Sequence, residues 1–269
     1  MSSGGERLET VLITGASSGI GRELAKCFAV SPCRLILVAR KRGALELLAE
    51  ELHKAHRTQS EVLPADLAHP DVAMRIFRHL ETHGTKVDVL VNNAGFGANG
   101  SFAELPVERQ MEMLQVNIST LTHLSRLMLP GMIKRGRGGI LNVASTAAFQ
   151  GGPGMAVYYA SKAYVLSFSE AIAEELAGTG VVVTVLCPGA TATNFFEAAN
   201  ASMSNFFRRN AMSAEAVARI GYDAFRDGKF VVVAGTKNKL MSFAVHLVPR
   251  AVARKVAKYL NQAGLAKQH

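Results

Sequence analysis

Short apolar runs rich in β-branched residues alternate with longer segments of helical periodicity along most of the chain. The runs predict seven strands, at residues 11–13, 34–39, 61–67, 87–91, 140–144, 181–186 and 229–234, the last at a sheet edge. The segments between them predict helices at residues 22–29, 45–56, 71–83, 108–129, 156–176 and 213–225. Apolar strands separated by helices are typical of a parallel sheet covered on both faces. We therefore expect an α/β fold, a doubly wound parallel sheet of about seven strands with right-handed connections.

The alternation breaks after Thr193. Residues 194–225 are rich in Phe, Met, Ala and Ser, a composition that favours a helical lid over a substrate. Residues 237–269 form a basic, partly amphipathic C-terminal extension. No repeat, linker or low-complexity stretch divides the chain, so we expect a single domain over residues 1–269, with residues 8–193 as its core.

The C-terminal extension carries most of the net charge of +9. From Gly228 onward the sequence has eight Lys or Arg and no Asp or Glu, which leaves 22 basic and 21 acidic residues before that point. This distribution argues against a nucleic-acid-binding body and favours an acidic partner or surface that meets the extension. Within residues 250–260, one helical face carries Val252, Val256, Tyr259 and Leu260, and Lys and Arg occupy the other. Such a helix either lies on an anionic membrane surface or packs on the domain or on a partner subunit, and both interpretations stay open.

Length and composition exclude several classes of protein. The 269 residues suit one large α/β domain, and 49% hydrophobic with 19% charged residues exclude a disordered chain. Cys27, Cys33 and Cys187 match neither a metal site nor a disulfide framework, so we expect no bound metal and a reducing compartment. The polar first residues predict no signal peptide, and no apolar run reaches the roughly 18 residues of a membrane span. We expect a cytoplasmic protein, with peripheral membrane association of the extension as the alternative.

Three glycines, Gly15, Gly19 and Gly21, follow the first strand and open the helix after it. Glycines let a backbone approach a pyrophosphate, which the free N–H groups of a helix N-terminus can bind. A plain tight turn between strand and helix explains the pattern equally well. The second strand ends at Arg40, with two further basic residues after it. Because Arg can bond a ribose phosphate bidentately, this end favours NADP over NAD, and a solvated strand end is the alternative.

Tyr158 and Lys162 stand four residues apart, which places both on one face of a helix, about 5–6 Å apart at Cβ. Ser145 precedes them, directly after a predicted strand and before a Gly-rich loop. An ammonium beside a phenol can lower the phenol's pKa from about 10 toward neutral, so Tyr158 is a candidate proton donor or acceptor. Asn117 lies inside a predicted helix, where a buried Asn needs hydrogen-bond partners and a solvent-facing Asn is the alternative.

Taken together, these motifs resemble the short-chain dehydrogenase/reductase family in its common short form. The resemblance covers residues 11–193 and rests on Thr14, Gly15, Gly19, Gly21, Asp66, Asn92, Asn93, Ala94, Gly95, Asn117, Ser145, Tyr158, Lys162, Pro188 and Gly189. It implies a Rossmann fold with NADP(H), preferred over NAD(H), across the carboxyl ends of the strands. The implied nucleotide contacts are Gly15, Ser17, Ser18, Gly19, Ile20, Gly21, Arg40, Asp66, Leu67, Asn93, Ala94, Gly95, Tyr158, Lys162, Pro188, Gly189, Thr191 and Thr193.

The resemblance implies an oxidoreductase that reduces a carbonyl to an alcohol, or the reverse, with Asn117, Ser145, Tyr158 and Lys162 as its catalytic residues. Ser145 would hold the carbonyl oxygen and Tyr158 would supply the proton. Lys162 would contact the nicotinamide ribose and lower the pKa of Tyr158 to about 7. Asn117 would hold a water that resupplies the proton. The family motif selects Tyr158, and the neighbouring Tyr159 is expected to pack instead.

The predicted substrate contacts are apolar, so an apolar ketone or aldehyde is the expected substrate. They are Phe96, Phe149, Met155, Phe195 and Phe196, although plain packing explains any one of them nearly as well. The basic extension suggests an alternative, a reductase for 3-oxoacyl chains that are lipid-linked at a membrane surface or held by an acidic carrier protein. A further alternative is an NADP-sensing protein without chemistry, which the complete catalytic set disfavours.

The resemblance also implies a homo-oligomer. Its interface would involve the helices predicted at residues 108–129 and 156–176. We expect a dimer rather than a tetramer because the C-terminal extension departs from the common short form.

Overall fold

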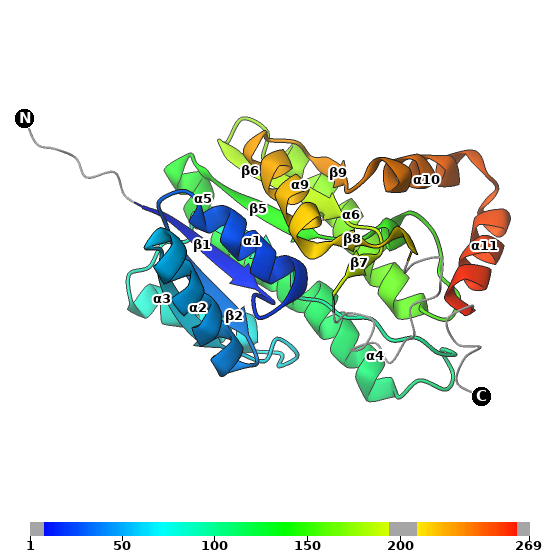
Figure 1. Cartoon of the computed structure of the whole chain (residues 1–269), viewed down its shortest axis with the longest axis horizontal. Coiled ribbons are helices and arrows are strands. Elements are labelled where there is room, and N and C mark those ends of the chain that lie inside the picture. The colour runs from blue at the N-terminus through cyan, green and yellow to red at the C-terminus, as the bar shows by residue number, and fades with distance from the viewer. Residues whose placement is uncertain (1–7, 194–208, 263–269) are drawn as a thin grey trace, which may run out of the picture.

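A seven-stranded parallel sheet runs through the computed structural model, which describes residues 8–193 and 209–262 (Figure 1). Its strands are β1 (Glu9–Thr14), β2 (Cys33–Ala39), β3 (Gln59–Pro64), β4 (Val89–Asn92), β5 (Gly138–Val143), β6 (Val181–Cys187) and β9 (Val231–Val233). The spatial order is β3-β2-β1-β4-β5-β6-β9. Strands β2 and β3 are added on one side of β1 and the later strands on its other side, so the switch point of the strand order lies between β1 and β4. Open α/β sheets bind ligands at such a switch point, outside the carboxyl ends of the strands. The predicted doubly wound fold is confirmed.

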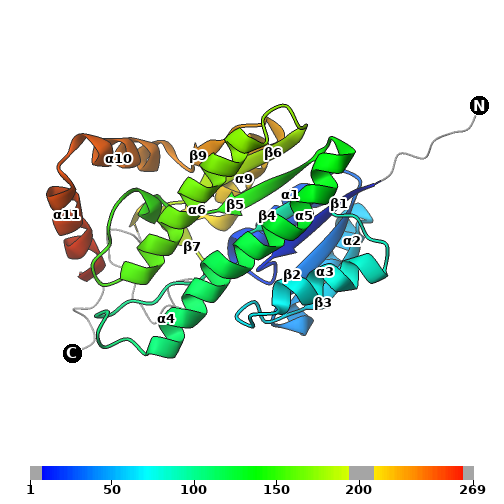
Figure 2. The same cartoon turned by 180° about the vertical axis from the view of Figure 1, so that it is seen from behind.

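Helices cover both faces of the sheet (Figures 1 and 2). The α-helices of the described residues are α1 (Gly19–Ala29), α2 (Arg42–His56), α3 (Val72–Thr82), α4 (Val107–Leu114), α5 (Leu121–Arg135), α6 (Ala156–Glu175), α9 (Ala214–Arg226), α10 (Thr236–Leu247) and α11 (Arg250–Gln262). One face packs against α1, α2 and α9, and the other packs against α3, α5 and α6. Within β1, Val11 and Ile13 join the first core and Leu12 joins the second. This alternation is the period-2 pattern of a strand that is buried on both faces.

The helix predicted over residues 108–129 is interrupted. Between α4 and α5 the chain forms a π-helical turn, η1 (Gln115–Thr120), and Asn117 lies inside it. Single π-turns within helices occur frequently at functional sites because they re-aim side chains. A short 3-10 turn, η2 (Thr146–Phe149), follows Ser145.

The segment expected as a lid is only partly described, because residues 194–208, with Phe195 and Phe196, lie outside the described residues. Its second half is α9, which packs in the body rather than over a site. Val217, Ala218 and Phe225 of α9 are buried with Phe28 of α1. The apolar composition of this half therefore reflects core packing against the sheet. Two short strands, β7 (Thr191–Ala192) and β8 (Met212–Ser213), pair beside it.

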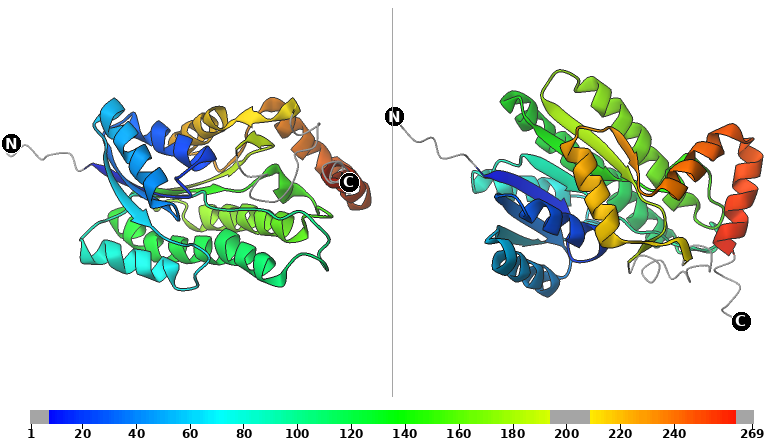
Figure 3. Two further views of the ribbon diagram at one scale, coloured as in Figure 1. Left: turned by 60° about the horizontal axis from the view of Figure 1, so that its bottom comes forward. Right: turned by 45° about the horizontal axis from the view of Figure 1, so that its top comes forward.

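The C-terminal extension forms two helices, α10 and α11, which lie at the opposite end of the molecule from α2 and α3 (Figures 1 and 3). The turn between them contains Pro249, whose carbonyl accepts the N–H of Val252 at 2.9 Å. Within the described part of the chain, no helix combines the length and the apolar character needed to cross a bilayer.

Candidate active site

The Gly-rich turn after β1 is tied to the end of β4. The Thr14 hydroxyl accepts the backbone N–H groups of Asn93 at 3.0 Å and Ala94 at 3.1 Å. The Asn93 amide in turn donates to the carbonyls of Thr14 at 2.9 Å and Gly15 at 3.2 Å. The side chain of Asn93 therefore braces the turn, while its predicted nucleotide contact stays a prediction.

Glycine is required in this turn for close approach. A Cβ on Gly21 would lie 2.3 Å from the Asn93 amide nitrogen and 2.4 Å from the Gly15 carbonyl oxygen. Gly15 and Gly19 have φ of +67° and +56°, which only glycine adopts readily. Ser18 precedes α1 without a side-chain cap, so the first N–H groups of α1 are open to an anion. This cradle fits the pyrophosphate of a dinucleotide.

Two predicted adenosine contacts lie at neighbouring strand ends. Arg40, directly after β2, has a 69% exposed side chain and approaches Glu112, with 3.8 Å between Nη1 and Oε1. A weak exposed pair of this kind leaves a guanidinium able to bind a phosphate. Asp66, two residues beyond β3, accepts the N–H of Ala68 at 3.0 Å through Oδ1.

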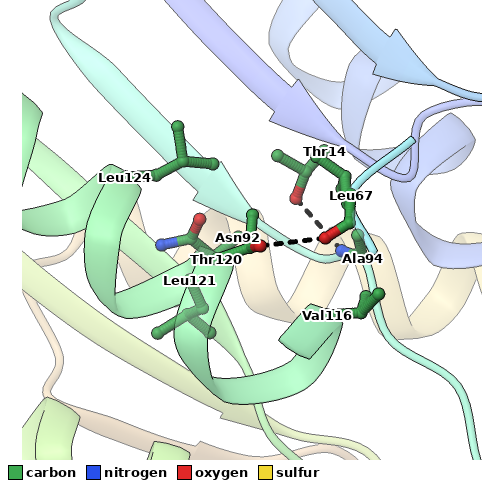
Figure 4. Close-up of a pocket in the computed structure, with 8 residues that line it drawn as sticks. All are labelled: Thr14, Leu67, Asn92, Ala94, Val116, Thr120, Leu121 and Leu124. Atoms are coloured by element: carbon green, nitrogen blue, oxygen red, sulfur yellow. Dashed lines mark hydrogen bonds between the residues drawn. The ribbon is translucent and has the colours of Figure 1, made fainter. Parts of the chain in front are cut away.

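The predicted contacts Leu67 and Ala94 are held by backbone hydrogen bonds at the edge of a small cavity of about 10 Å³ (Figure 4). The Thr120 hydroxyl donates to the carbonyl of Leu67 at 2.9 Å. The Thr14 hydroxyl accepts from Ala94, as described above. The π-turn and the Gly-rich turn thus meet at this point of the sheet edge.

Ser145, Tyr158 and Lys162 come together beyond the end of β5. The Ser145 and Tyr158 hydroxyls share a hydrogen bond, and Ser145 Oγ also accepts the N–H of Ala147 at 3.1 Å. Lys162 Nζ donates to the carbonyl of Val143 at 2.8 Å and lies 5.9 Å from the centroid of the Tyr158 ring. Both Tyr158 and Lys162 are buried. The predicted juxtaposition of a serine, a tyrosine and a lysine is present.

The expected lowering of the Tyr158 pKa is wrong for the protein alone. Burial raises the pKa of Tyr158 to about 12, although the hydrogen bond from Ser145 acts to lower it. Burial also lowers the pKa of Lys162 to about 8. The physical reason is that each charged form loses its hydration, while the Lys162 ammonium is bonded to the Val143 carbonyl. Tyr158 is therefore a protonated hydroxyl at neutral pH, which is the form that donates a proton.

Asn117 is buried, so the solvent-facing interpretation is wrong. Its Oδ1 accepts the N–H of Phe96 at 3.1 Å, and its Nδ2 donates to the Phe96 carbonyl at 3.0 Å and to Ser161 Oγ at 2.9 Å. The Asn117 side chain thereby fixes the segment that follows β4 onto α6. The predicted water contact of Asn117 stays a prediction. Ser161 was missed, and its position between Tyr158 and Lys162 was the available signal.

The three described substrate candidates divide into two groups. Phe96 and Met155 belong to the apolar cluster that contains Tyr158, and the Arg109 guanidinium lies 3.9 Å from the Phe96 ring centroid. Phe149 packs in a different cluster and meets His246 of α10 edge-on, with 5.8 Å between ring centroids. Phe96 of the loop after β4 and Met155 of the loop before α6 therefore share one apolar cluster with the Tyr158 side chain.

The C-terminal extension reaches the predicted nucleotide segment after β6. A Cβ on Gly189 would lie 2.4 Å from the side-chain nitrogen of Asn238 in α10. The Pro188 carbonyl accepts the N–H of Thr146 at 2.8 Å, and Thr191 Oγ1 donates to the Gly189 carbonyl at 3.0 Å. The glycine is needed here because α10 covers it, a tertiary contact that no local pattern predicts.

Two further contacts close the site. Thr193 Cγ2 lies 3.0 Å from the position of a Cβ on Gly19, so the end of the β6 segment meets the Gly-rich turn. Tyr159 is buried and donates to Asn261 Oδ1 of α11 at 3.2 Å. Tyr159 therefore packs, as expected, and it also anchors the extension.

The sheet edge, the glycine cradle and the Ser-Tyr-Lys set are features of nucleotide-dependent α/β oxidoreductases. Residues 9–204 match the family described as short chain dehydrogenase, so the chain belongs to this family of oxidoreductases. It is 34% identical over 181 residues to the ketoacyl reductase HetN of Nostoc, across 67% of this chain and 63% of that protein. The match thus spans less than two thirds of the Nostoc protein.

Solved structures of relatives superpose closely. A short-chain dehydrogenase from Sphingobium yanoikuyae in complex with NADPH is 29% identical, with a TM-score of 0.81 and coverage of 91% of this chain and 95% of that one. A short chain dehydrogenase/reductase from Burkholderia phymatum in complex with NAD is 26% identical, with a TM-score of 0.80 and coverage of 92% and 95%. Structures of relatives with either nucleotide therefore resemble this chain.

Proposed function

We propose that the protein is an NADP(H)-dependent reductase of an apolar ketone or aldehyde, or catalyses the reverse alcohol oxidation. The observation that carries the proposal is the hydrogen-bonded pair of Ser145 and Tyr158 hydroxyls, with the Lys162 ammonium beside them. This group lies at the same sheet edge as the glycine cradle. A substrate carbonyl that contacts both hydroxyls would therefore adjoin the nucleotide site.

The residues have separate roles in the proposed reduction. A bound nicotinamide nucleotide supplies the hydride. The Ser145 hydroxyl donates to the carbonyl oxygen and orients it, and the Tyr158 hydroxyl gives that oxygen its proton. With its pKa raised to about 12, Tyr158 carries this proton at neutral pH and is in the form that can donate it to the carbonyl oxygen. Lys162, with a pKa of about 8, is largely charged at pH 7 and counters the phenolate that forms.

A second candidate is reduction of 3-oxoacyl chains. The ketoacyl reductase name of the Nostoc relative favours it, as does the basic C-terminal extension, which suits an acidic carrier. Consumption of NADPH and NADH against aldehydes, steroids, 3-oxoacyl esters and quinones separates the candidates. We expect turnover of bulky apolar carbonyls; turnover confined to 3-oxoacyl esters would select the second candidate. Nucleotide binding with no turnover of any compound would instead favour a sensing protein.

The preference for NADP(H) is assigned to Arg40. In a bound nucleotide its guanidinium would contact the 2′-phosphate, and an acid at that place would repel the phosphate. We predict that Arg40→Asp lowers kcat/KM for NADPH relative to NADH by about tenfold or more. A change of this size corresponds to the loss of at least one charge-assisted hydrogen bond. Arg75→Asp on α3, an exposed change of the same charge, is the matched control. An unchanged NADPH/NADH ratio in Arg40→Asp would refute the assignment.

We also propose a cytoplasmic homodimer that forms through α5 and α6. These helices present a joint surface, because Tyr164 of α6 stacks on Phe168 with 5.7 Å between ring centroids and its hydroxyl shares a 2.9 Å hydrogen bond with Thr122 of α5. The three buried cysteines without disulfides suit a reducing compartment. Sedimentation velocity of the intact chain tests the dimer.

A further inference from the structure

The first helix of the C-terminal extension turns its large apolar side chains away from the body. In α10 the half-buried Asn238 and the buried Ser242 face the body. Leu240, Phe243 and Leu247, which follow one another at helical spacing, are 68%, 61% and 71% exposed. A helix that packs on its own domain normally buries such residues.

The second helix repeats this arrangement. In α11 the small residues Ala253 and Ala257 are buried. Val252, Val256 and Tyr259 are 48%, 53% and 75% exposed, although they form the apolar face that the sequence pattern singles out. Leu260, at the edge of that face, is half-buried, so the helix packs on the domain mainly through its alanines and leaves most of its apolar face exposed. The apolar residues of both helices together form what we name the extension surface: Leu240, Met241, Phe243, Leu247, Val248, Val252, Val256 and Tyr259.

The extension surface is fixed to the site by specific contacts. Asn261 of α11 accepts from Tyr159 and donates to the Pro153 carbonyl at 3.0 Å. Arg254 lies against Gly151, 3.5 Å from the position of a Cβ there. Gly151 and Pro153 lie on the loop between Ser145 and Tyr158, which we name the substrate loop, and Tyr159 follows it in α6. Whatever the extension binds is therefore held beside the substrate loop.

Charge indicates what the extension surface meets. Lys237, Lys239, Arg254, Lys255 and Lys258 are exposed around the apolar side chains. No acidic residue occurs from Gly228 to the end of the sequence. A symmetric contact between two copies would therefore bring basic residues against basic residues. Large apolar side chains flanked by Lys and Arg are the features of helices that lie in the interface of anionic bilayers.

We propose that α10 and α11 dock the protein on the surface of an anionic lipid bilayer, with the extension surface among the acyl chains and the basic residues at the lipid head groups. Docking would hold the substrate loop next to the membrane, where an apolar carbonyl compound concentrates. The proposal goes beyond the reaction proposed above, because binding to lipid requires no turnover.

Sedimentation of the full chain with vesicles tests the proposal. We expect binding to phosphatidylcholine vesicles that contain phosphatidylserine, weak binding to phosphatidylcholine alone, and loss of binding as salt rises. Phe243→Ser with Leu247→Ser, and separately Lys255→Ala with Lys258→Ala, should each weaken binding about tenfold or more. All four positions are exposed, and thermal unfolding verifies that the variants fold.

Matched controls lie on distant helices. Leu47→Ser removes an equally exposed apolar side chain from α2, and Arg75→Ala with Arg78→Ala removes two exposed charges from α3. These variants should bind vesicles like the natural sequence. Absence of vesicle binding, or equal binding by all variants, would overturn the proposal. The proposal would also be overturned if the Phe243 and Leu247 changes dissociated a dimer of the protein. Binding of a purified acidic carrier protein without binding to vesicles would overturn it as well.

Discussion

At the scale of single residues, Lys162 shows a conflict between folding and chemistry. Its ammonium is buried, with one hydrogen bond to the Val143 carbonyl. Burial lowers its pKa to about 8 from 10.5. A buried charge of this kind destabilises the fold, and proteins keep such groups mainly at functional sites.

We predict that Lys162→Met abolishes turnover yet raises the free energy of unfolding at pH 7 by about 1–3 kcal/mol. Between pH 8 and 10.5 the unfolded chain binds more protons at Lys162 than the folded chain, so this group makes stability rise with pH across that window. The variant should lack this part of the rise. Urea unfolding at a series of pH values checks both effects, and a variant less stable at pH 7 with the same pH slope would contradict them.

The site residues that could be predicted from the sequence are those whose spacing along the chain matches a motif. The family motif, with its tyrosine four residues before the lysine, selected Tyr158 over Tyr159, and the structure gives the two tyrosines different partners. The partners of Asn117 could not be predicted, because they are backbone groups of Phe96, brought there by tertiary packing. The direction in which the pKa of Tyr158 shifts also depends on how deeply the side chain is buried, which residue spacing does not reveal.

At the scale of elements, apolar runs predicted where the sheet strands lie in the sequence and that they are parallel, because parallel strands buried on both faces read as continuous apolar segments. The π-turn at Gln115–Thr120 was not predicted, since one wider turn hardly changes the apolar period of the helix around it. The assignment of α9 to a lid was wrong because apolar composition does not distinguish a lid from a helix buried on the sheet.

The Gly-rich turn is the element whose geometry is most demanding. We predict that Gly21→Ala costs about 1–3 kcal/mol of stability through overlap with Asn93 and Gly15, and weakens NADPH binding about tenfold or more by displacing the turn. Gly43→Ala in α2 is the control, because a Cβ there meets nothing within 4 Å. Fluorescence titration with NADPH measures both variants. Equal affinity in Gly21→Ala and the natural sequence would show that the turn does not hold the nucleotide.

At the scale of the whole molecule, the site is assembled from segments far apart in the sequence. Hydrogen bonds join the Gly-rich turn after β1 to the loop after β4, and they join that loop and α6 to the π-turn. Ser145, two residues beyond β5, bonds Tyr158 of α6. The C-terminal extension then contacts this group through Asn238 and Asn261. The sequence predicted a basic amphipathic tail, but its placement against the substrate loop depends on these tertiary contacts.

The assembled site depends on Tyr158 as the proton donor in a nucleotide-dependent reduction. Comparing Tyr158→Phe with Tyr159→Phe for carbonyl-dependent NADPH oxidation and for NADPH affinity tests this role. Loss of a general acid costs about a hundredfold to ten-thousandfold in rate. We predict such a fall in kcat for Tyr158→Phe with unchanged NADPH affinity, and near-normal kcat for Tyr159→Phe. Undiminished turnover in Tyr158→Phe would show that another group supplies the proton.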